Sequence, residues 1–253
     1  MGISGEASGE DQLRLQRCFE IVPERVALGT APTTLIPMSR SVQTIGLIDY
    51  GMGNLFSVQT CFERLGSPLK TVQNSDDLDG CQALILPGVG AFDPAMDRLN
   101  ATGLIPELCA WSGADRPLLG ICLGLQLLFE SSEEGHRDGL GLLPGRVKRL
   151  PKDQRERIPH MGWGRLHIDR PSPLLPNRSS AEWMYFVHSF AAEPEEIKHC
   201  AASVEFGKGL ATAAVWRNRL GACQFHPEKS AITGQRLLSR WLEWLKQGAP
   251  LMQ

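Results

Sequence analysis

From about residue 44 onward, the apolar residues form short runs that alternate with helical stripes. The runs have the length and composition of buried strands: TIGLID (44–49), LKTVQ (69–73), ALILP (83–87) and PLLGI (117–121). After the first run, apolar residues recur every three or four positions and predict a helix that Asn54 caps and Gly66 ends. A second helical region runs from about Asp93 to Trp111. Strands that alternate with helices predict a mostly parallel sheet with right-handed crossovers.

The second half of the chain has a different pattern. Its strand-like runs follow one another through turns, which favours some antiparallel pairing: EWMYFVHSF (182–190), CAASVEF (200–206), LATAAVW (210–216) and GACQFH (221–226). The segment 230–248 then carries one apolar stripe, made of Ile232, Leu237, Leu238, Trp241 and Leu245. We therefore expect a final amphipathic helix that covers the sheet with this stripe.

The first 40 residues lack sustained periodicity of either kind. They open with acidic and small residues and lack the apolar core of a signal peptide, and three prolines interrupt them, at Pro23, Pro32 and Pro37. We expect residues 1–40 to form a weakly ordered extension and residues 41–253 to form the folded domain. Two alternatives stay open. A short helix could form around Leu13–Ile21, or the protein could start at Met38, with the preceding residues added by an over-long gene prediction.

Composition narrows the function classes. The 253 residues are 42% hydrophobic and 21% charged, with a formal net charge of −2, so nothing favours binding to nucleic acid or to a membrane surface. No apolar run approaches the roughly 20 residues that span a bilayer. The seven cysteines form an odd, scattered set without C-x-x-C spacing. This pattern argues against a disulfide framework and a zinc site, and it favours a reducing compartment such as the cytoplasm.

One cysteine lies in the pattern of a nucleophile elbow. Cys122 follows a predicted strand and precedes a predicted helix, with Gly120 and Gly124 two residues to either side. In such an elbow a strained turn exposes the nucleophile, the helix dipole favours a thiolate, and the next N–H, that of Leu123, is free for an oxyanion. A buried packing cysteine is the alternative, but two glycines make a poor helix interior.

A cysteine nucleophile needs a base, and the base needs a group that orients it. His226 follows the last predicted strand and is followed by Pro227 and Glu228. If Pro227 keeps this backbone extended, the side chains of His226 and Glu228 point the same way and meet. The alternative is an ordinary turn at a strand end. A third element, Gly88-Val89-Gly90 after the strand ALILP, offers backbone N–H groups for an oxyanion, or else is a plain loop.

These elements, in this order, resemble a class I (triad-type) glutamine amidotransferase over roughly residues 44–247. The resemblance implies a flavodoxin-like α/β fold, a three-layer sandwich, with a Cys-His-Glu triad. The stretches that carry it are IDYGMGNL, LPGVGAF, GICLGLQLLFESSEEG, PHMGWG, YFVHSF and FHPEKS. Among them, DYGMGN, PHMGW and YFVHSF are similar to the glutaminase subfamily that serves imidazole glycerol phosphate synthases.

The resemblance implies a role for each matching position. Cys122 would attack the carboxamide of glutamine to give a thioester, His226 would carry the proton, and Glu228 would orient His226. The oxyanion would be held by Leu123 and by Gly88, Val89 or Gly90, which reorient on activation. Glutamine would be held by Gly90, Gln126, Glu134, His188, Ser189 and Phe190. Trp163, Tyr185 and Lys229 would face a cyclase subunit, which uses the ammonia to make imidazole glycerol phosphate and AICAR in histidine biosynthesis. Neither a metal nor a cofactor is implied.

Several other readings are weighed against this one. Another class I glutaminase would supply ammonia for a purine, anthranilate or pyridoxal product. A different cysteine hydrolase on a similar sheet, such as a γ-glutamyl hydrolase or a DJ-1-like protein, would act alone, although Glu228 argues against the DJ-1-like pattern. A flavodoxin-like binding module would lack catalysis, but the phosphate loop it requires after the first strand is missing. Trp163 and Tyr185 as core aromatics, and His160 and His188 as ordinary histidines, are the corresponding structural alternatives.

Overall fold

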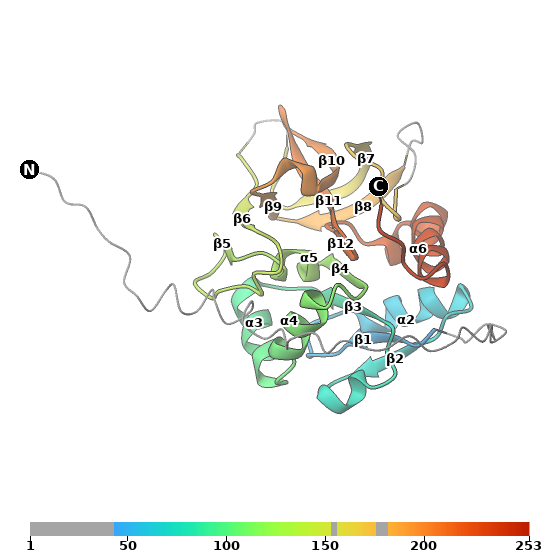
Figure 1. Cartoon of the computed structure of the whole chain (residues 1–253). Helices are drawn as coiled ribbons and strands as arrows, with labels where there is room; N and C mark the ends of the chain where they lie inside the picture. Colours follow the sequence, from blue (N-terminus) through green and yellow to red (C-terminus); the bar gives the residue numbers. More distant parts are fainter. Residues whose placement is uncertain (1–42, 153–155, 176–181, 253) are drawn as a thin grey trace, which may run out of the picture. The chain divides into compact units, whose positions relative to one another are not determined.

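The computed structural model describes residues 43–152, 156–175 and 182–252 (Figure 1). The predicted extension over residues 1–40, the helix considered at Leu13–Ile21 and the start considered at Met38 lie outside the described residues. They therefore stay predictions.

The first half of the described chain alternates strands and helices. The strands are β1 (Ile45–Ile48), β2 (Leu69–Val72), β3 (Ala83–Gly88) and β4 (Leu118–Cys122), and the helices are α2 (Leu55–Arg64), the 3₁₀ turn η1 (Ser75–Leu78), α3 (Phe92–Ala101) and α4 (Ile105–Gly113). The Asn54 side chain accepts the backbone N–H of Ser57 at 3.2 Å, which is the predicted N-cap bond. The helical region after Asp93 is two helices, because the chain turns at Gly103, whose φ is +72°.

The second half is mainly strands. It contains α5 (Leu123–Leu127), β5 (Ser131–Ser132), β6 (Gly145–Arg149), β7 (His160–Ile168), β8 (Trp183–His188), β9 (Phe190–Pro194), η2 (Ile197–His199), β10 (Cys200–Phe206), β11 (Gly209–Arg217), β12 (Leu220–Cys223), η3 (Pro227–Lys229) and α6 (Ala231–Lys246). Each of the four predicted strand runs is a strand here, and the run 182–190 divides into β8 and β9. The division falls at Ser189, where the chain passes from one sheet to the other.

The main sheet has nine strands in the order β2-β1-β3-β4-β12-β11-β10-β7-β8. The pairs from β2 to β12 are parallel, and the pairs from β12 to β8 are antiparallel. The order of the parallel strands is that of a flavodoxin-like fold. The predicted α/β fold, parallel in its first half with antiparallel strands later, is confirmed. A small sheet of β5, β6 and β9, which the pattern did not predict, lies beside it.

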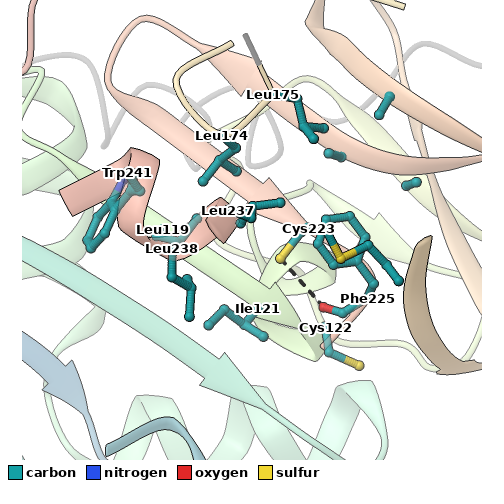
Figure 2. Packing of buried hydrophobic residues seen from close by; sticks show 14 of the residues in the cluster. Leu119, Ile121, Cys122, Leu174, Leu175, Cys223, Phe225, Leu237, Leu238 and Trp241 are labelled. Carbon is teal, nitrogen blue, oxygen red and sulfur yellow. Dashed lines mark hydrogen bonds between the residues drawn. The ribbon is translucent and has the colours of Figure 1, made fainter. Parts of the chain in front are cut away.

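Helices cover both faces of the parallel strands (Figure 1). Apolar residues of α2 and α6 belong to one buried cluster, and those of α3, α4 and α5 belong to another. In Figure 2, Leu237 and Leu238 of α6 lie over Leu119 and Ile121 of β4, with Cys122 at the end of that strand. The sheet is therefore the middle of three layers, and its strands are apolar on both faces because both are covered.

The stripe predicted for the last helix is wrong at one position. Ile232 is 59% exposed, while Leu237, Leu238 and Trp241 are buried. Gly234 lies on the buried side of α6 instead, where an added Cβ would lie 1.9 Å from the carbonyl oxygen of Pro227. The first turn of the helix therefore approaches η3 through backbone rather than through an apolar side chain. Among the described residues, no helix is both long enough and apolar enough to span a membrane.

Candidate active site

Cys122 has the backbone geometry of a strained turn between β4 and α5. Its φ is +56° and its ψ is −110°, a conformation that non-glycine residues rarely adopt. The flanking glycines make the turn sterically possible. A Cβ on Gly124 would lie 1.8 Å from the carbonyl oxygen of Leu86, and a Cβ on Gly120 would lie 2.9 Å from the carbonyl oxygen of Gly124. The sequence G-x-C-x-G thus folds as an elbow because the strand and helix backbones pass in contact.

The sheet topology brings three chain segments to the same edge. In the parallel ladders, Gly88 of β3 pairs with Cys122 of β4, and Ile121 pairs with Cys223 of β12. The carboxyl ends of these strands therefore lie side by side, and each continues into a segment that the sequence singled out. His226 follows β12 by three residues. This is the edge where ligands bind in open α/β sheets.

His226 and Glu228 form a buried pair. Nδ1 of His226 lies 2.8 Å from a carboxylate oxygen of Glu228, and the two side chains are 3% and 1% exposed. The contact is made by a different local geometry from the one expected. Pro227 opens the 3₁₀ turn η3 rather than extending the chain, and this turn swings Glu228 back toward the ring.

Further hydrogen bonds hold the turn in place. The N–H of His226 donates to the carbonyl oxygen of Tyr185 in β8 at 3.0 Å, and the Ser230 hydroxyl donates to the carbonyl oxygen of His226 at 2.6 Å. Burial by itself lowers the pKa of His226, but the Cys122 sulfur and the Glu228 carboxylate outweigh burial and raise that pKa to about 10. In the described part of the chain, Nε2 of His226 has no partner within the geometry of a formed hydrogen bond.

A cavity of about 300 Å³ opens at this edge. Most of the site residues predicted from the sequence line it: Val89, Gly90, Cys122, Leu123, Gln126, Glu134, His188, Ser189, Phe190 and His226. Pro159 and Val187 complete the lining. Gly88 and Glu228 stand behind it, Gly88 beside the elbow and Glu228 against the histidine. Segments that are far apart in the sequence thus form one concave site.

The Gly88–Gly90 segment adopts one defined conformation. The N–H of Val89 donates to the carbonyl oxygen of Met52 at 3.1 Å, and Gly90 has φ +102°. A Cβ on Gly90 would lie 2.9 Å from the terminal methyl of Met52. In this conformation the Val89 N–H is engaged by the loop after β1 and does not face an oxyanion in the cavity.

An exposed carboxylate also lines the cavity. Glu134 is exposed, and one of its oxygens accepts the N–H of Phe92 at 2.9 Å, at the start of α3. The contact fixes the position of the carboxylate and leaves its second oxygen for a ligand. A negative charge held at the mouth of the cavity suits a ligand with an ammonium group.

Polar side chains at the cavity wall form a largely buried chain of hydrogen bonds. The carbonyl oxygen of Phe190 lies 2.9 Å from Nδ1 of His188 and 3.0 Å from Nε2 of Gln126. Nε2 of His188 lies 3.2 Å from Nδ1 of His160, and Nε2 of Gln126 lies 3.0 Å from Oε1 of Gln224. The chain therefore runs from β7 to the segment after β12.

Sequence reasoning did not assign Gln224 a role and treated His160 as an ordinary histidine. A signal was present for Gln224, since it is a polar residue in an apolar strand segment, two residues before His226. No comparable signal marks His160, whose neighbour His188 is 28 positions away in the sequence. Tyr50 was missed as well. It is buried beside the elbow and donates its hydroxyl to the carbonyl oxygen of Pro87 at 2.8 Å.

The residues expected at a partner surface lie on neighbouring strands. Trp163 of β7 pairs with Tyr185 of β8, and their rings meet edge to face with centroids 6.2 Å apart. Trp163 is 51% exposed, which contradicts the core-aromatic alternative, and Met161 and Trp183 expose 63% and 49% on the same pair of strands. Lys229 is exposed in η3. Within the described ranges, no group of three or more His, Cys, Asp or Glu side chains is placed to hold a metal ion.

The fold and the site together define an α/β protein with a cysteine elbow and a buried His-Glu pair at one sheet edge. Residues 46–243 match the family model described as glutamine amidotransferase class-I. Imidazole glycerol phosphate synthase subunit HisH 2 of Parasynechococcus marenigrum strain WH8102 is 60% identical over 82% of this chain and 98% of its own length. Subunit HisH of Synechococcus sp. strain CC9605 is 62% identical over 81% of this chain and 96% of its own.

Solved structures agree on the fold. One described as a glutamine amidotransferase superposes with a TM-score of 0.63 at 20% identity, over 81% of this chain and 99% of that one. PurLQS from Thermotoga maritima gives the same TM-score at 18% identity, over 80% and 99%. This chain belongs to the class-I glutamine amidotransferase family, in the group of the imidazole glycerol phosphate synthase HisH subunits.

Proposed function

We propose that this chain is the glutaminase subunit of an imidazole glycerol phosphate synthase. It would hydrolyse glutamine and pass the ammonia to a cyclase subunit, as part of histidine biosynthesis in the cytoplasm. The observation that carries the proposal is the placement of Cys122 at a strained elbow, on the cavity that also receives His226. The names of relatives about 60% identical over four-fifths of the chain supply the pathway.

The proposed chemistry begins at the sulfur of Cys122. The thiol proton passes to Nε2 of His226, and the sulfur attacks the carboxamide carbon of glutamine. The tetrahedral intermediate collapses to a thioester as the amine leaves as ammonia with the proton from His226. Water then cleaves the thioester and releases glutamate. Glu228 supports both steps, because its carboxylate fixes the ring and stabilises the protonated imidazole.

The cavity lining suits the rest of glutamine. Glu134 would face the α-ammonium, and backbone N–H groups around Gly90, Ser189 and Phe190 would donate to the α-carboxylate. Both N–H bonds of the Gln126 side chain are used within the protein, toward Phe190 and Gln224. Gln126 therefore offers a ligand only its oxygen, which is able to accept an N–H of the carboxamide.

The oxyanion would be held by the N–H of Leu123 and by one N–H of the Gly88–Gly90 segment. In the conformation described, the Val89 N–H is bonded to Met52, so the second donor requires this segment to reorient. Glycines on both sides of Val89 make such a rotation sterically inexpensive. We assign the cyclase subunit to the exposed surface around Trp163, Tyr185 and Lys229, from which β8 leads directly to the backbone of His226.

A glutaminase assay with and without a cyclase subunit tests the proposal. Glutamate release that depends on Cys122 and rises in the complex supports it. Turnover that is independent of any cyclase favours a free-standing cysteine amidohydrolase. Activation by the synthase of another pathway favours a class I glutaminase that serves that pathway.

A further inference from the structure

We propose that Gln224 is a further residue of the glutaminase reaction, whose side-chain N–H donates to the Cys122 sulfur and stabilises the attacking thiolate. This inference rests on the proposed function and adds a group that touches the reacting atom. Nε2 of Gln224 lies 3.7 Å from the sulfur, and the side chain is fully buried. A donor to sulfur favours the charged thiolate over the neutral thiol, because hydrogen bonds to an ionised acceptor are the stronger ones.

The direction of this bond follows from the carbonyl of Phe190. A glutamine amide has an oxygen face and a nitrogen face, so its orientation must be argued from its partners. The Phe190 carbonyl is able only to accept, so Gln126 turns its nitrogen toward it at 3.0 Å. The second hydrogen on that nitrogen points to Oε1 of Gln224, also at 3.0 Å. The Gln224 oxygen therefore faces Gln126, which leaves its nitrogen facing the sulfur.

The same carbonyl fixes the histidine side of the chain. Nδ1 of His188 must carry a hydrogen to donate to Phe190, and burial lowers the pKa of His188 to about 4, so its Nε2 is a bare acceptor near neutral pH. Nδ1 of His160 is then the donor to that acceptor. Every hydrogen in this chain of hydrogen bonds has one defined position, and such a network is rigid. Gln224 is thus held ready before a substrate arrives.

The surroundings of the sulfur make a neutral donor useful. The titratable groups that face Cys122 are His226, Tyr50 and Cys223. Burial raises the pKa of both Tyr50 and Cys223, so these two stay uncharged near neutral pH. His226 takes the thiol proton. Gln224 compensates the remaining negative charge on the sulfur without gaining or losing a proton, and it does so again when the thiolate leaves the thioester.

The test is the alkylation of Cys122 by iodoacetamide in Gln224→Met, followed by mass spectrometry of the Cys122 peptide. Methionine keeps the length and volume of the side chain and removes the N–H donor. We expect the pH at half-maximal alkylation rate to rise by about one unit, with the rate at high pH within about twofold of wild type. In the complex, kcat for glutamine hydrolysis should fall about tenfold, with KM changed less than about threefold.

Gln224→Asn is the second variant, because it keeps an amide but withdraws it by one methylene, and the same direction of shift is expected. Cys223→Ala is the matched control, since it changes the packing of the adjacent buried residue and removes no donor to Cys122; its alkylation profile should not move. Circular dichroism and thermal melting verify that each variant is folded. A half-maximal pH that does not move in the folded Gln224 variants overturns the proposal, as does a lower rate at high pH with an unmoved midpoint, which indicates a structural role. Alkylation needs no glutamine, so failure here is separate from failure of the glutaminase assignment.

Discussion

The N–H of Val89 donates to the carbonyl oxygen of Met52 at 3.1 Å, and this bond turns it away from the place where an oxyanion would form. The bond joins two loops at the carboxyl ends of β1 and β3, and it would have to break before Val89 could serve as a donor. A glutaminase that hydrolyses glutamine with no acceptor ready loses its ammonia to water as ammonium. If Val89 is an oxyanion donor, as proposed, a closed oxyanion hole in the isolated chain would prevent that loss.

The isolated chain should therefore be a very poor glutaminase. Removing one oxyanion donor typically costs about 10²- to 10³-fold in rate, so activation by partner and acceptor should be at least of that order. Steady-state glutamate release should be measured in three states: the chain alone, the complex with the cyclase subunit, and that complex with the nucleotide-like substrate of the cyclase bound. Equal rates in the three states would contradict both the closed oxyanion hole and the partnership with a cyclase subunit.

Changing Cys122 to Ala or Ser should abolish glutamine hydrolysis and leave the fold intact, because Cys122 is the only thiol among the described residues that line the cavity with His226. Glutamate release is the measurement, with circular dichroism as the folding control. Cys223→Ala, a buried neighbour, should retain activity. The Cys122 variants in the complex should still form product when ammonia is supplied directly. The elbow assignment fails if Cys122→Ala is active and Cys223→Ala is not.

The elbow should tolerate no side chain at Gly124. A Cβ there would lie 1.8 Å from the carbonyl oxygen of Leu86, so Gly124→Ala forces the strand and helix apart and should destabilise the fold by about 3 kcal/mol or more. Gly113→Ala is the matched control, because Gly113 is helical and a Cβ there meets nothing within 4 Å. Its stability should stay within about 1 kcal/mol of wild type. Urea unfolding compares the two, and equal midpoints would refute the close-contact explanation.

Acid should destabilise the protein through His188. Burial lowers its pKa from 6.5 to about 4, so between those values the unfolded chain binds a proton that the folded chain does not. Stability from this residue is therefore complete above about pH 6.5 and is lost as the pH falls toward about 4, a loss of about 2 kcal/mol between about pH 7 and about pH 5.

The measurement for His188 is urea unfolding of wild type and His188→Asn at both pH values. The difference in the free energy of unfolding between about pH 7 and about pH 5 should be smaller in the variant than in wild type, by about 2 kcal/mol. His136→Asn, at an exposed histidine, should behave as wild type. An unchanged difference in His188→Asn would show that another group carries the acid sensitivity.

Removing residues 1–37, so that the chain starts at Met38, should change neither glutaminase activity in the complex nor the melting temperature. The reason is the proline-interrupted, aperiodic sequence before the first strand, together with relatives that match 98% of their own length to 82% of this chain. Loss of partner binding, or a melting temperature lower by several degrees, would show that the segment belongs to the functional protein.

The sequence by itself determined much of this protein. Buried strands and amphipathic helices are local patterns, so the strands of the parallel half, the cap at Asn54 and the elbow at Cys122 were readable from neighbouring residues. The motif G-x-C-x-G was informative because both glycines are required by contacts within one strand, turn and helix. The proximity of Cys122 and His226 was inferred from two strand ends and the order of motifs.

Tertiary structure alone decided the rest. Gly234 replaces Ile232 on the buried side of α6 because η3 packs against that turn, and Pro227 begins a 3₁₀ turn whose shape depends on β8 and Ser230. The hydrogen-bonded chain from His160 through Phe190 to Gln224 joins segments that lie far apart in the sequence. Hydrogen bonds between distant segments leave no periodic trace in a sequence, because each donor needs one acceptor that only the folded backbone brings within reach.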